Sequence, residues 1–98
     1  MAKLSADQAK RRMADVPGWR RVAGEMPSIR KQYELDAFVS ALKFVNKVGR
    51  LAEAANHHPD ITINYNKVTL LLTTHDAGGL TEKDFNLARQ IDESTKRR

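Results

Sequence analysis

Hydrophobic and polar positions change their period several times along the chain, and each change marks a predicted element. Near the N-terminus, Ser5 and Gln8 have the spacing of a helix-capping box, and small apolar residues follow at helical intervals until Pro17. Alternating apolar and polar positions over 29–35 predict a β-strand, and residues 19–23 predict a shorter one before it. We therefore expect the first third of the chain to form one short helix and a β-hairpin.

The longest helical pattern follows Asp36, a residue type that favours helix N-caps. Seven apolar residues recur on one side of this expected helix, whereas Lys43, Lys47 and Arg50 fall on the opposite side. A helix of this kind buries its apolar stripe against a sheet and leaves its basic side in solvent. The stripe consists of Phe38, Ala41, Leu42, Val45, Val48, Ala52 and Ala55.

Two further strands and a final helix are expected after Pro59. Residues 61–65 alternate in polarity, and residues 67–75 are rich in β-formers with an apolar middle, so together they predict a second hairpin. The pattern at 81–84 is typical of a helix start. The order α-β-β-α-β-β-α predicts an α+β fold in which three helices pack on one face of a four-stranded antiparallel sheet. The order of the strands within the sheet is not predicted by these patterns.

The length and composition narrow the class of protein. With 98 residues the chain is expected to form one domain, spanning 1–98, with a small core. Small cores gain stability from self-association, so we expect a homo-oligomer, either a dimer or a tetramer. The absence of cysteine excludes disulfides and thiolate metal sites. No stretch has the roughly 20 apolar residues of a membrane span, and the N-terminus lacks a signal-peptide core, so a cytoplasmic protein is expected.

The net charge of +5 raises the question of a nucleic-acid partner. The basic runs lie near the two ends of the chain, at 10–12 and 96–98. Basic residues at such positions are typical of solvated tails or of helix C-termini, where they complement the helix dipole. The charge pattern therefore favours solvated ends over nucleic-acid binding.

All three histidines lie in the part of the chain that is richest in functional side chains. His57 and His58 follow the expected long helix, where the negative end of the helix dipole favours protonated imidazole. His75 ends the expected strand that pairs with 61–65, so the hairpin register could return it to the same corner. Grouped imidazoles can donate and accept protons near neutral pH, as general acid and base catalysis requires. Adjacent histidines can also be simple residues of a helix C-terminus.

Glu53 lies about three helical turns beyond Leu42, at the edge of the apolar stripe, so we expect a half-shielded carboxylate there. It could orient a histidine or form an ion pair at the helix edge. Three histidines with nearby carboxylates also suggest zinc, but neighbouring side chains diverge, and neither cysteine nor an HExxH pair is present. The sequence also lacks a Gly-x-Ser-x-Gly elbow and a phosphate-binding glycine loop.

Seven positions in this part of the chain have a characteristic spacing. They carry Glu53, His57, His58, Pro59, Tyr65, His75 and Asp84. In this spacing, and in the stretches Gly18-Trp19, KQYELDAF, YNKV and GLTEKDFNLA, the chain resembles the pterin-4a-carbinolamine dehydratase family. The likeness weakens only at the two ends of the chain, and Asp60-Ile61 stands where some relatives carry a Glu-Trp pair.

The resemblance implies a lyase that dehydrates 4a-hydroxytetrahydrobiopterin to quinonoid dihydrobiopterin and water by histidine acid-base catalysis, and thereby supports tetrahydrobiopterin recycling. It implies no metal and no cofactor. The implied site residues are catalytic His57, His75 and Glu53 and substrate-binding His58, Pro59 and Asp84. Within this set the resemblance makes Glu53 the residue that orients the histidines. Asp84 has an equal second interpretation, as part of the capping pattern that begins at Thr81.

The resemblance also bears on partners. Animal members of this family can act as dimerisation partners of a homeodomain transcription factor, so the resemblance leaves a transcription-factor partner open. No feature of this sequence supports carrying that role over. The expected partners are therefore the small pterin substrate and further copies of the same chain, with no membrane partner.

Overall fold

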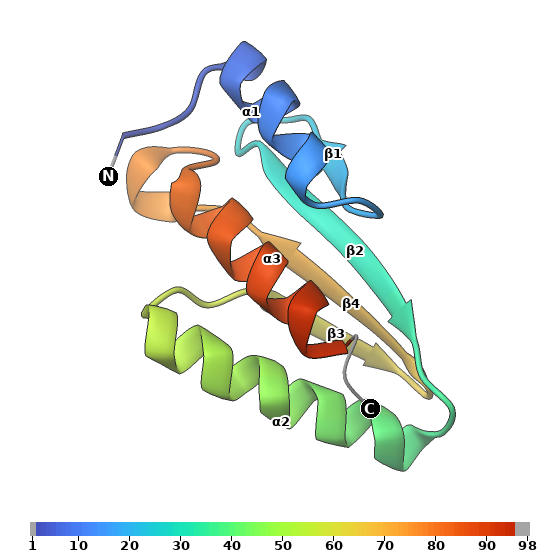
Figure 1. Cartoon of the computed structure of the whole chain (residues 1–98). Helices are drawn as coiled ribbons and strands as arrows, with labels where there is room; N and C mark the ends of the chain where they lie inside the picture. The colour runs from blue at the N-terminus through green and yellow to red at the C-terminus, as the bar shows by residue number, and fades with distance from the viewer. Residues whose placement is uncertain (1, 96–98) are drawn as a thin grey trace.

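A computed structural model describes residues 2–95 and shows three helices packed on one face of a four-stranded antiparallel sheet (Figure 1). The elements are α1 (Ala6–Arg12), β1 (Arg20–Val22), β2 (Ser28–Glu34), α2 (Phe38–Ala55), β3 (Asp60–Asn64), β4 (Lys67–Leu72) and α3 (Glu82–Thr95), with 3₁₀ turns at Met13–Asp15 and His75–Ala77. The predicted fold class and element order are confirmed. None of the helices within residues 2–95 combines the length and the apolarity needed to cross a membrane.

The strands lie in the order β1-β2-β4-β3, so β2 and β4 form the centre of the sheet. β2 pairs with β4 from Ile29 opposite Leu72 onward, and β4 pairs with β3 from Asp60 opposite Leu71. Both pairings are antiparallel. The chain that enters β3 therefore runs beside the chain that leaves β4, and this juxtaposition brings two separate segments of the sequence to one corner.

The core lies between the sheet and helices α2 and α3. Its buried apolar residues are Ala41, Phe44, Val48 and Ala52 from α2, Ile29 from β2, Val68, Leu70 and Leu72 from β4, and Phe85, Leu87, Ala88 and Ile91 from α3, together with Ala9, Val16, Trp19 and Leu80. The predicted apolar stripe of α2 is wider than the side that this core buries. Phe38 and Leu42, both in that stripe, stay 45% and 40% exposed.

The helix starts follow the sequence only in part. The capping box of Ser5 and Gln8 forms as predicted, since each side chain accepts a hydrogen bond from the other residue's backbone N–H. The predicted N-cap role of Asp36 is wrong. Ala37 occupies the N-cap of α2, and no side chain caps this helix. Ala37, one residue after Asp36, has the extended backbone conformation that precedes the first turn of α2.

Asp92 of α3 ties the helix layer to the sheet. Its carboxylate accepts hydrogen bonds from Trp19 Nε1 at 3.1 Å, from Lys31 Nζ at 2.9 Å and from the Tyr33 hydroxyl at 2.5 Å. Burial of Tyr33, reinforced by the hydrogen bond and the negative charge of Asp92, raises the pKa of the Tyr33 hydroxyl. One carboxylate thus joins α3, β2 and the segment before β1.

Replacing Tyr33 with Phe should remove this hydroxyl and keep the ring. We expect the free energy of unfolding to fall by about 1–3 kcal/mol at neutral pH, the range for a hydrogen bond to a charged group. Because the pKa of Tyr33 is raised in the folded state, its stabilising contribution is complete below pH of about 10 and is lost as the pH rises above that value.

Urea unfolding at pH 7 and pH 11 measures both effects. The difference in the free energy of unfolding between wild type and Tyr33→Phe should be smaller at pH 11 than at pH 7. Tyr65→Phe is the matched control, because Tyr65 is 70% exposed and its loss of a hydroxyl should change stability little. No destabilisation by Tyr33→Phe at pH 7, or the same difference at both pH values, would contradict the assignment.

Candidate functional site

The end of α2 places the first histidine. Asn56 takes the left-handed conformation with φ 52°, and the His57 N–H donates to the Ala52 carbonyl oxygen at 3.1 Å. This geometry ends the helix with a sharp turn. Pro59 follows and cannot continue a helix, so the chain leaves the turn directly into β3.

His57 and Asp84 form the buried centre of the site. The side chain of His57 is 9% exposed and that of Asp84 is 0% exposed, and His57 Nε2 lies 2.5 Å from Asp84 Oδ1. An ionised carboxylate only accepts hydrogen bonds, so Nε2 donates and carries the proton of the neutral ring. Asp84 thereby determines which ring nitrogen of His57 is protonated.

The second nitrogen of His57 reaches the surface. Within residues 2–95, Nδ1 has no hydrogen-bond partner, and no side-chain nitrogen or oxygen there is both buried and without a partner. Nδ1 therefore retains contact with solvent although the ring around it is buried. A ring with one nitrogen held by a carboxylate and the other accessible is arranged to accept and return a proton.

Two threonines hold Asp84 in place. Its Oδ2 accepts from the Thr81 backbone N–H and from Thr74 Oγ1, each at 2.9 Å. The two threonine hydroxyls lie 2.8 Å apart, and Thr81 Oγ1 also accepts from the Lys83 backbone N–H at 3.2 Å. Asp84 is thus at once a capping residue and the partner of His57, so both of its interpretations describe the same side chain.

The expectation of a half-shielded Glu53 is wrong. Its side chain is 78% exposed, and Glu53 Oε2 lies 2.5 Å from Nε2 of His58, whose side chain is 57% exposed. Glu53 therefore contacts His58 and not His57 or His75. The two adjacent histidines therefore pair with carboxylates in different environments. The pair of His57 and Asp84 is buried, whereas the pair of His58 and Glu53 is open to water.

The prediction that His75 ends a strand is wrong. β4 ends at Leu72, and exposed His75 begins the 3₁₀ turn after it. Thr74 N–H donates to the Gly79 carbonyl at 3.0 Å and closes this loop. Because Thr74 also binds Asp84, His75 directly follows a residue that shares a carboxylate with His57. Among the described residues, the His75 ring forms no hydrogen bond.

Thr74 is the site residue that sequence reasoning missed. It lies next to His75 and ten residues before Asp84, and nothing in its local pattern indicates a bond to that carboxylate. In the part of the chain that the structure describes, no group of three or more His, Cys, Asp or Glu side chains is placed to hold a metal ion.

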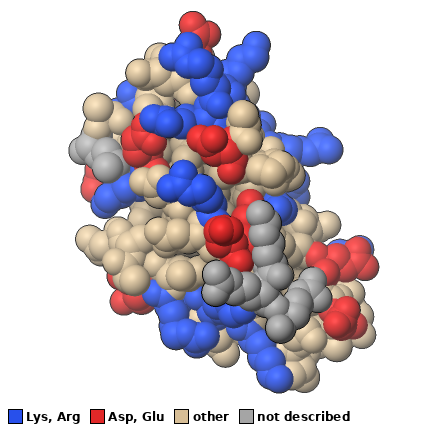
Figure 2. All heavy atoms as spheres, in the orientation of Figure 1, with Lys and Arg blue, Asp and Glu red and all other residues tan. Residues whose placement is uncertain are grey.

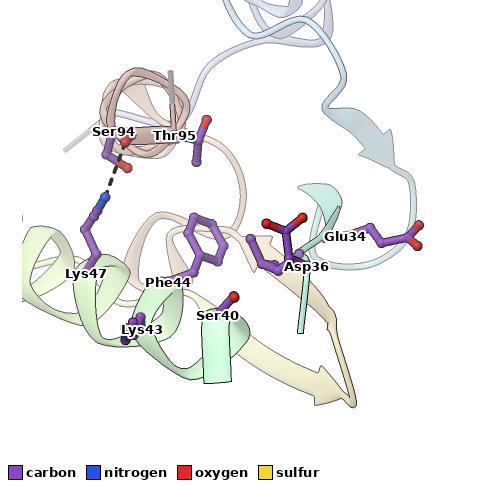
Figure 3. A pocket seen from close by; sticks show the side chains of 9 residues that line it. Glu34, Asp36, Ser40, Lys43, Phe44, Lys47, Ser94 and Thr95 are labelled. Carbon is purple, nitrogen blue, oxygen red and sulfur yellow. Dashed lines mark hydrogen bonds between the residues drawn. The ribbon is translucent and has the colours of Figure 1, made fainter. Parts of the chain in front are cut away.

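A pocket of about 300 Å³ lies elsewhere, between α2, the end of β2 and the end of α3 (Figure 3). Lys47 reaches across it from α2 and donates to the Ser94 carbonyl at 3.4 Å. The lining residues are Glu34, Leu35, Asp36, Ser40, Lys43, Phe44, Lys47, Ser94 and Thr95. None of the three histidines lines this pocket, which carries charges of both signs.

Basic and acidic side chains are interspersed over the face drawn in Figure 2. Arg12, from the basic run near the N-terminus, forms an ion pair with Glu82 at the start of α3. Part of that run therefore contacts an acidic neighbour instead of forming an isolated basic patch. The second basic run, 96–98, lies outside the described residues.

Comparison with known proteins identifies the family. The family model described as pterin 4 alpha carbinolamine dehydratase matches residues 2–94. A protein from Roseiflexus sp. (strain RS-1), provisionally named a pterin-4-alpha-carbinolamine dehydratase, is 57% identical over 91 residues, which cover 93% of this chain and 95% of that protein. Another from Acidobacterium capsulatum, with the same provisional name, is 50% identical over 92 residues, or 94% and 97% of the two chains. The chain belongs to the pterin 4 alpha carbinolamine dehydratase family, as the resemblance implied.

Solved structures agree with the fold. The crystal structure of a transcriptional coactivator/pterin dehydratase from Brucella melitensis has a TM-score of 0.87 and 28% identity, and the match covers 93% of this chain and 96% of that one. A pterin dehydratase-like protein, identified as a RuBisCO assembly factor in the alpha-carboxysome, has a TM-score of 0.68 and 20% identity over 81% and 90% of the two chains. The second likeness concerns the fold alone.

Replacing Asp84 with Asn should destabilise the protein more than replacing Glu53 with Gln. An amide has one acceptor oxygen and cannot satisfy all the donors around position 84, so we expect a loss of about 1–3 kcal/mol. The exposed pair of Glu53 and His58 should contribute less than about 1 kcal/mol. Urea unfolding at pH 7 measures both values, and equal losses would argue against a buried centre at Asp84.

Proposed function

We propose that this protein is a dehydratase that converts 4a-hydroxytetrahydrobiopterin to quinonoid dihydrobiopterin and water, and thereby supports recycling of tetrahydrobiopterin. Membership of the family supports dehydration of pterin carbinolamines in general. The observation that carries the proposal is His57, whose ring is anchored to buried Asp84 through Nε2 while Nδ1 reaches the surface.

The reaction needs two proton transfers. An acid must protonate the 4a-hydroxyl group as the C4a–O bond breaks and water leaves, and a base must take up the proton that the pterin ring loses. One proton is given and one is taken, so the enzyme returns to its starting state after the two groups exchange a proton with water. Proton transfer alone balances this reaction, and the proposal therefore includes no metal and no cofactor.

His57 and His75 are the proposed acid-base pair. Asp84 supports the role of His57 because a buried carboxylate stabilises the imidazolium that forms when Nδ1 accepts a proton. His75 is exposed and follows Thr74, which binds the same carboxylate, so its position is compatible with action on a substrate beside His57.

The remaining residues are proposed to bind or position. His58, which is paired with exposed Glu53, and its neighbour Pro59 are proposed to contact the pterin. Asp84 has a fully buried side chain, so we assign it to positioning His57 instead of to the substrate contact that the resemblance implied. Glu53 correspondingly orients His58.

The proposal includes a cytoplasmic location and an assembly of identical chains. A sequence without cysteine fits a reducing compartment, and a 98-residue domain gains burial by self-association. The pterin is the proposed small-molecule partner. The names of the structural neighbours include a coactivator and an assembly factor, but no contact described above favours either role for this chain.

A rapid-mixing assay of 4a-hydroxytetrahydrobiopterin decay tests the proposal. Wild type should accelerate decay clearly above the rate in buffer, and His57→Ala and His75→Ala should each lower kcat by about 10²-fold or more, the usual contribution of a general acid or base. His58→Ala should act mainly on KM, because His58 is proposed to bind.

Gln90→Ala on the exposed surface of α3 provides the control and should retain full activity. A wild-type rate no faster than buffer would overturn the enzymatic proposal. Full activity in both His57→Ala and His75→Ala would overturn the histidine assignment and leave the dehydratase proposal standing.

A further inference from the structure

The pocket of about 300 Å³ between α2, the end of β2 and the end of α3 is lined by none of the residues assigned to the proposed reaction (Figure 3). It lies beside the first half of α2, whereas His57 follows the end of that helix. A concave space of this size, with a few polar groups facing it, is the usual form of a small-molecule site. The groups that line the pocket therefore indicate which class of molecule fits it.

A fixed aromatic ring forms part of the apolar wall of the pocket. Phe44 is 6% exposed, and its ring centroid lies 4.7 Å from that of Tyr33. The hydroxyl group of Tyr33 donates to Asp92, so Phe44 packs against a ring that is itself held in place. Leu35 also lines the pocket. This wall is formed before any ligand arrives, and a ligand that covers it loses little free energy to reorganisation of the protein.

Charged side chains of opposite sign reach the pocket from different elements. Lys43 and Lys47 come from α2. Glu34 ends β2, and Asp36 lies in the segment that follows. Figure 3 shows the two lysines to one side of Phe44 and Asp36 to the other. In the described part of the chain these lysines and carboxylates form no ion pairs, so their charges are separated across the pocket instead of neutralising one another.

A purely structural role accounts for only one of the two lysines. Lys47 Nζ donates to the Ser94 carbonyl at 3.4 Å, near the C-terminus of α3, where a positive charge complements the helix dipole. Among residues 2–95, neither the Lys43 ammonium group nor the Asp36 carboxylate forms a hydrogen bond. One group of each charge that lines the pocket is therefore available to a ligand.

We propose that this pocket binds a small zwitterion, in the class of free amino acids and dipeptides with an apolar side chain. The carboxylate of the ligand lies between Lys43 and Lys47, which are one helical turn apart on the same side of α2. Its ammonium group contacts Asp36, and its side chain covers the ring of Phe44. This ligand and the pterin occupy separate sites, so the inference does not depend on the reaction proposed above.

A ligand with a single charge fits the pocket less well. A simple anion that approaches the lysines also faces the carboxylates of Glu34 and Asp36, and a simple cation faces the same lysines. Like charges brought together in this way oppose binding. A molecule that carries both groups places each of them beside the opposite charge.

Chemical shifts of the ¹⁵N-labelled protein test the inference, with leucine and glycyl-leucine as the two probes. At least one probe should cause saturable shifts at Ser40, Lys43 and Phe44, with a Kd in roughly the millimolar range for so few ligand atoms. Acetylation of the amino group of that probe, or amidation of its carboxylate, removes one charge. Each blocked form should bind at least about tenfold more weakly, the usual effect of losing a hydrogen bond between charged groups.

Variants test the two charged walls separately. Lys43→Gln and Asp36→Asn should each weaken binding of the probe by about tenfold or more. Arg50→Gln is the matched control for Lys43→Gln, because Arg50 is also exposed on α2 but does not line the pocket, and it should bind as wild type does. No saturable binding of either probe, shifts centred outside the pocket, or equal binding of the blocked forms would overturn the proposal. These measurements require no enzymatic turnover, so they stand apart from the proposed function.

Discussion

The buried hydrogen bond between His57 and Asp84 is the contact on which the arrangement of the site depends. It joins the end of α2 to the first turn of α3, and Thr74 connects the same carboxylate to the loop after β4. Each of these segments lies at the end of a helix or strand, where some backbone groups have no partner within that element. Such a segment needs contacts with its neighbours to hold one conformation. The shared carboxylate gives all three a common partner and leaves one nitrogen of His57 facing solvent.

The residues that hold the site in place are buried, whereas those that a ligand could reach are exposed. Asp84 and Thr81 are fully buried, whereas His58, Glu53 and His75 are exposed on the same corner of the molecule. Exposed side chains that are held in position by buried neighbours suit the binding of a small flat substrate from solvent. Asp92 forms a similar junction between α3 and the sheet, so the two ends of α3 are each held by a hydrogen-bonded carboxylate.

Local patterns were sufficient for the fold class, the element order and the capping box of α1, because each depends on residues close together in sequence. The strand order was not predictable, since two hairpins can join through either of their edges. The hydrogen bond from Thr74 to Asp84 was missed because it depends on how the loop after β4 folds back onto the start of α3, which local patterns do not indicate. The shielding of Glu53 and the strand position of His75 were wrong because helical spacing and β-propensity do not indicate where the neighbouring elements end. The exposed flank at Phe38 and Leu42 reflects the same limit, since a stripe records apolarity and not which side the core covers.

The central claim is that Asp84 makes His57 an effective proton-transfer group without touching the substrate. It is tested most directly by kcat and KM for 4a-hydroxytetrahydrobiopterin dehydration in folded Asp84→Asn, beside Glu53→Gln. The account predicts that Asp84→Asn lowers kcat by at least about tenfold and leaves KM nearly unchanged, because the carboxylate no longer orients the ring of His57 for proton transfer. A kcat equal to that of wild type in Asp84→Asn would contradict it.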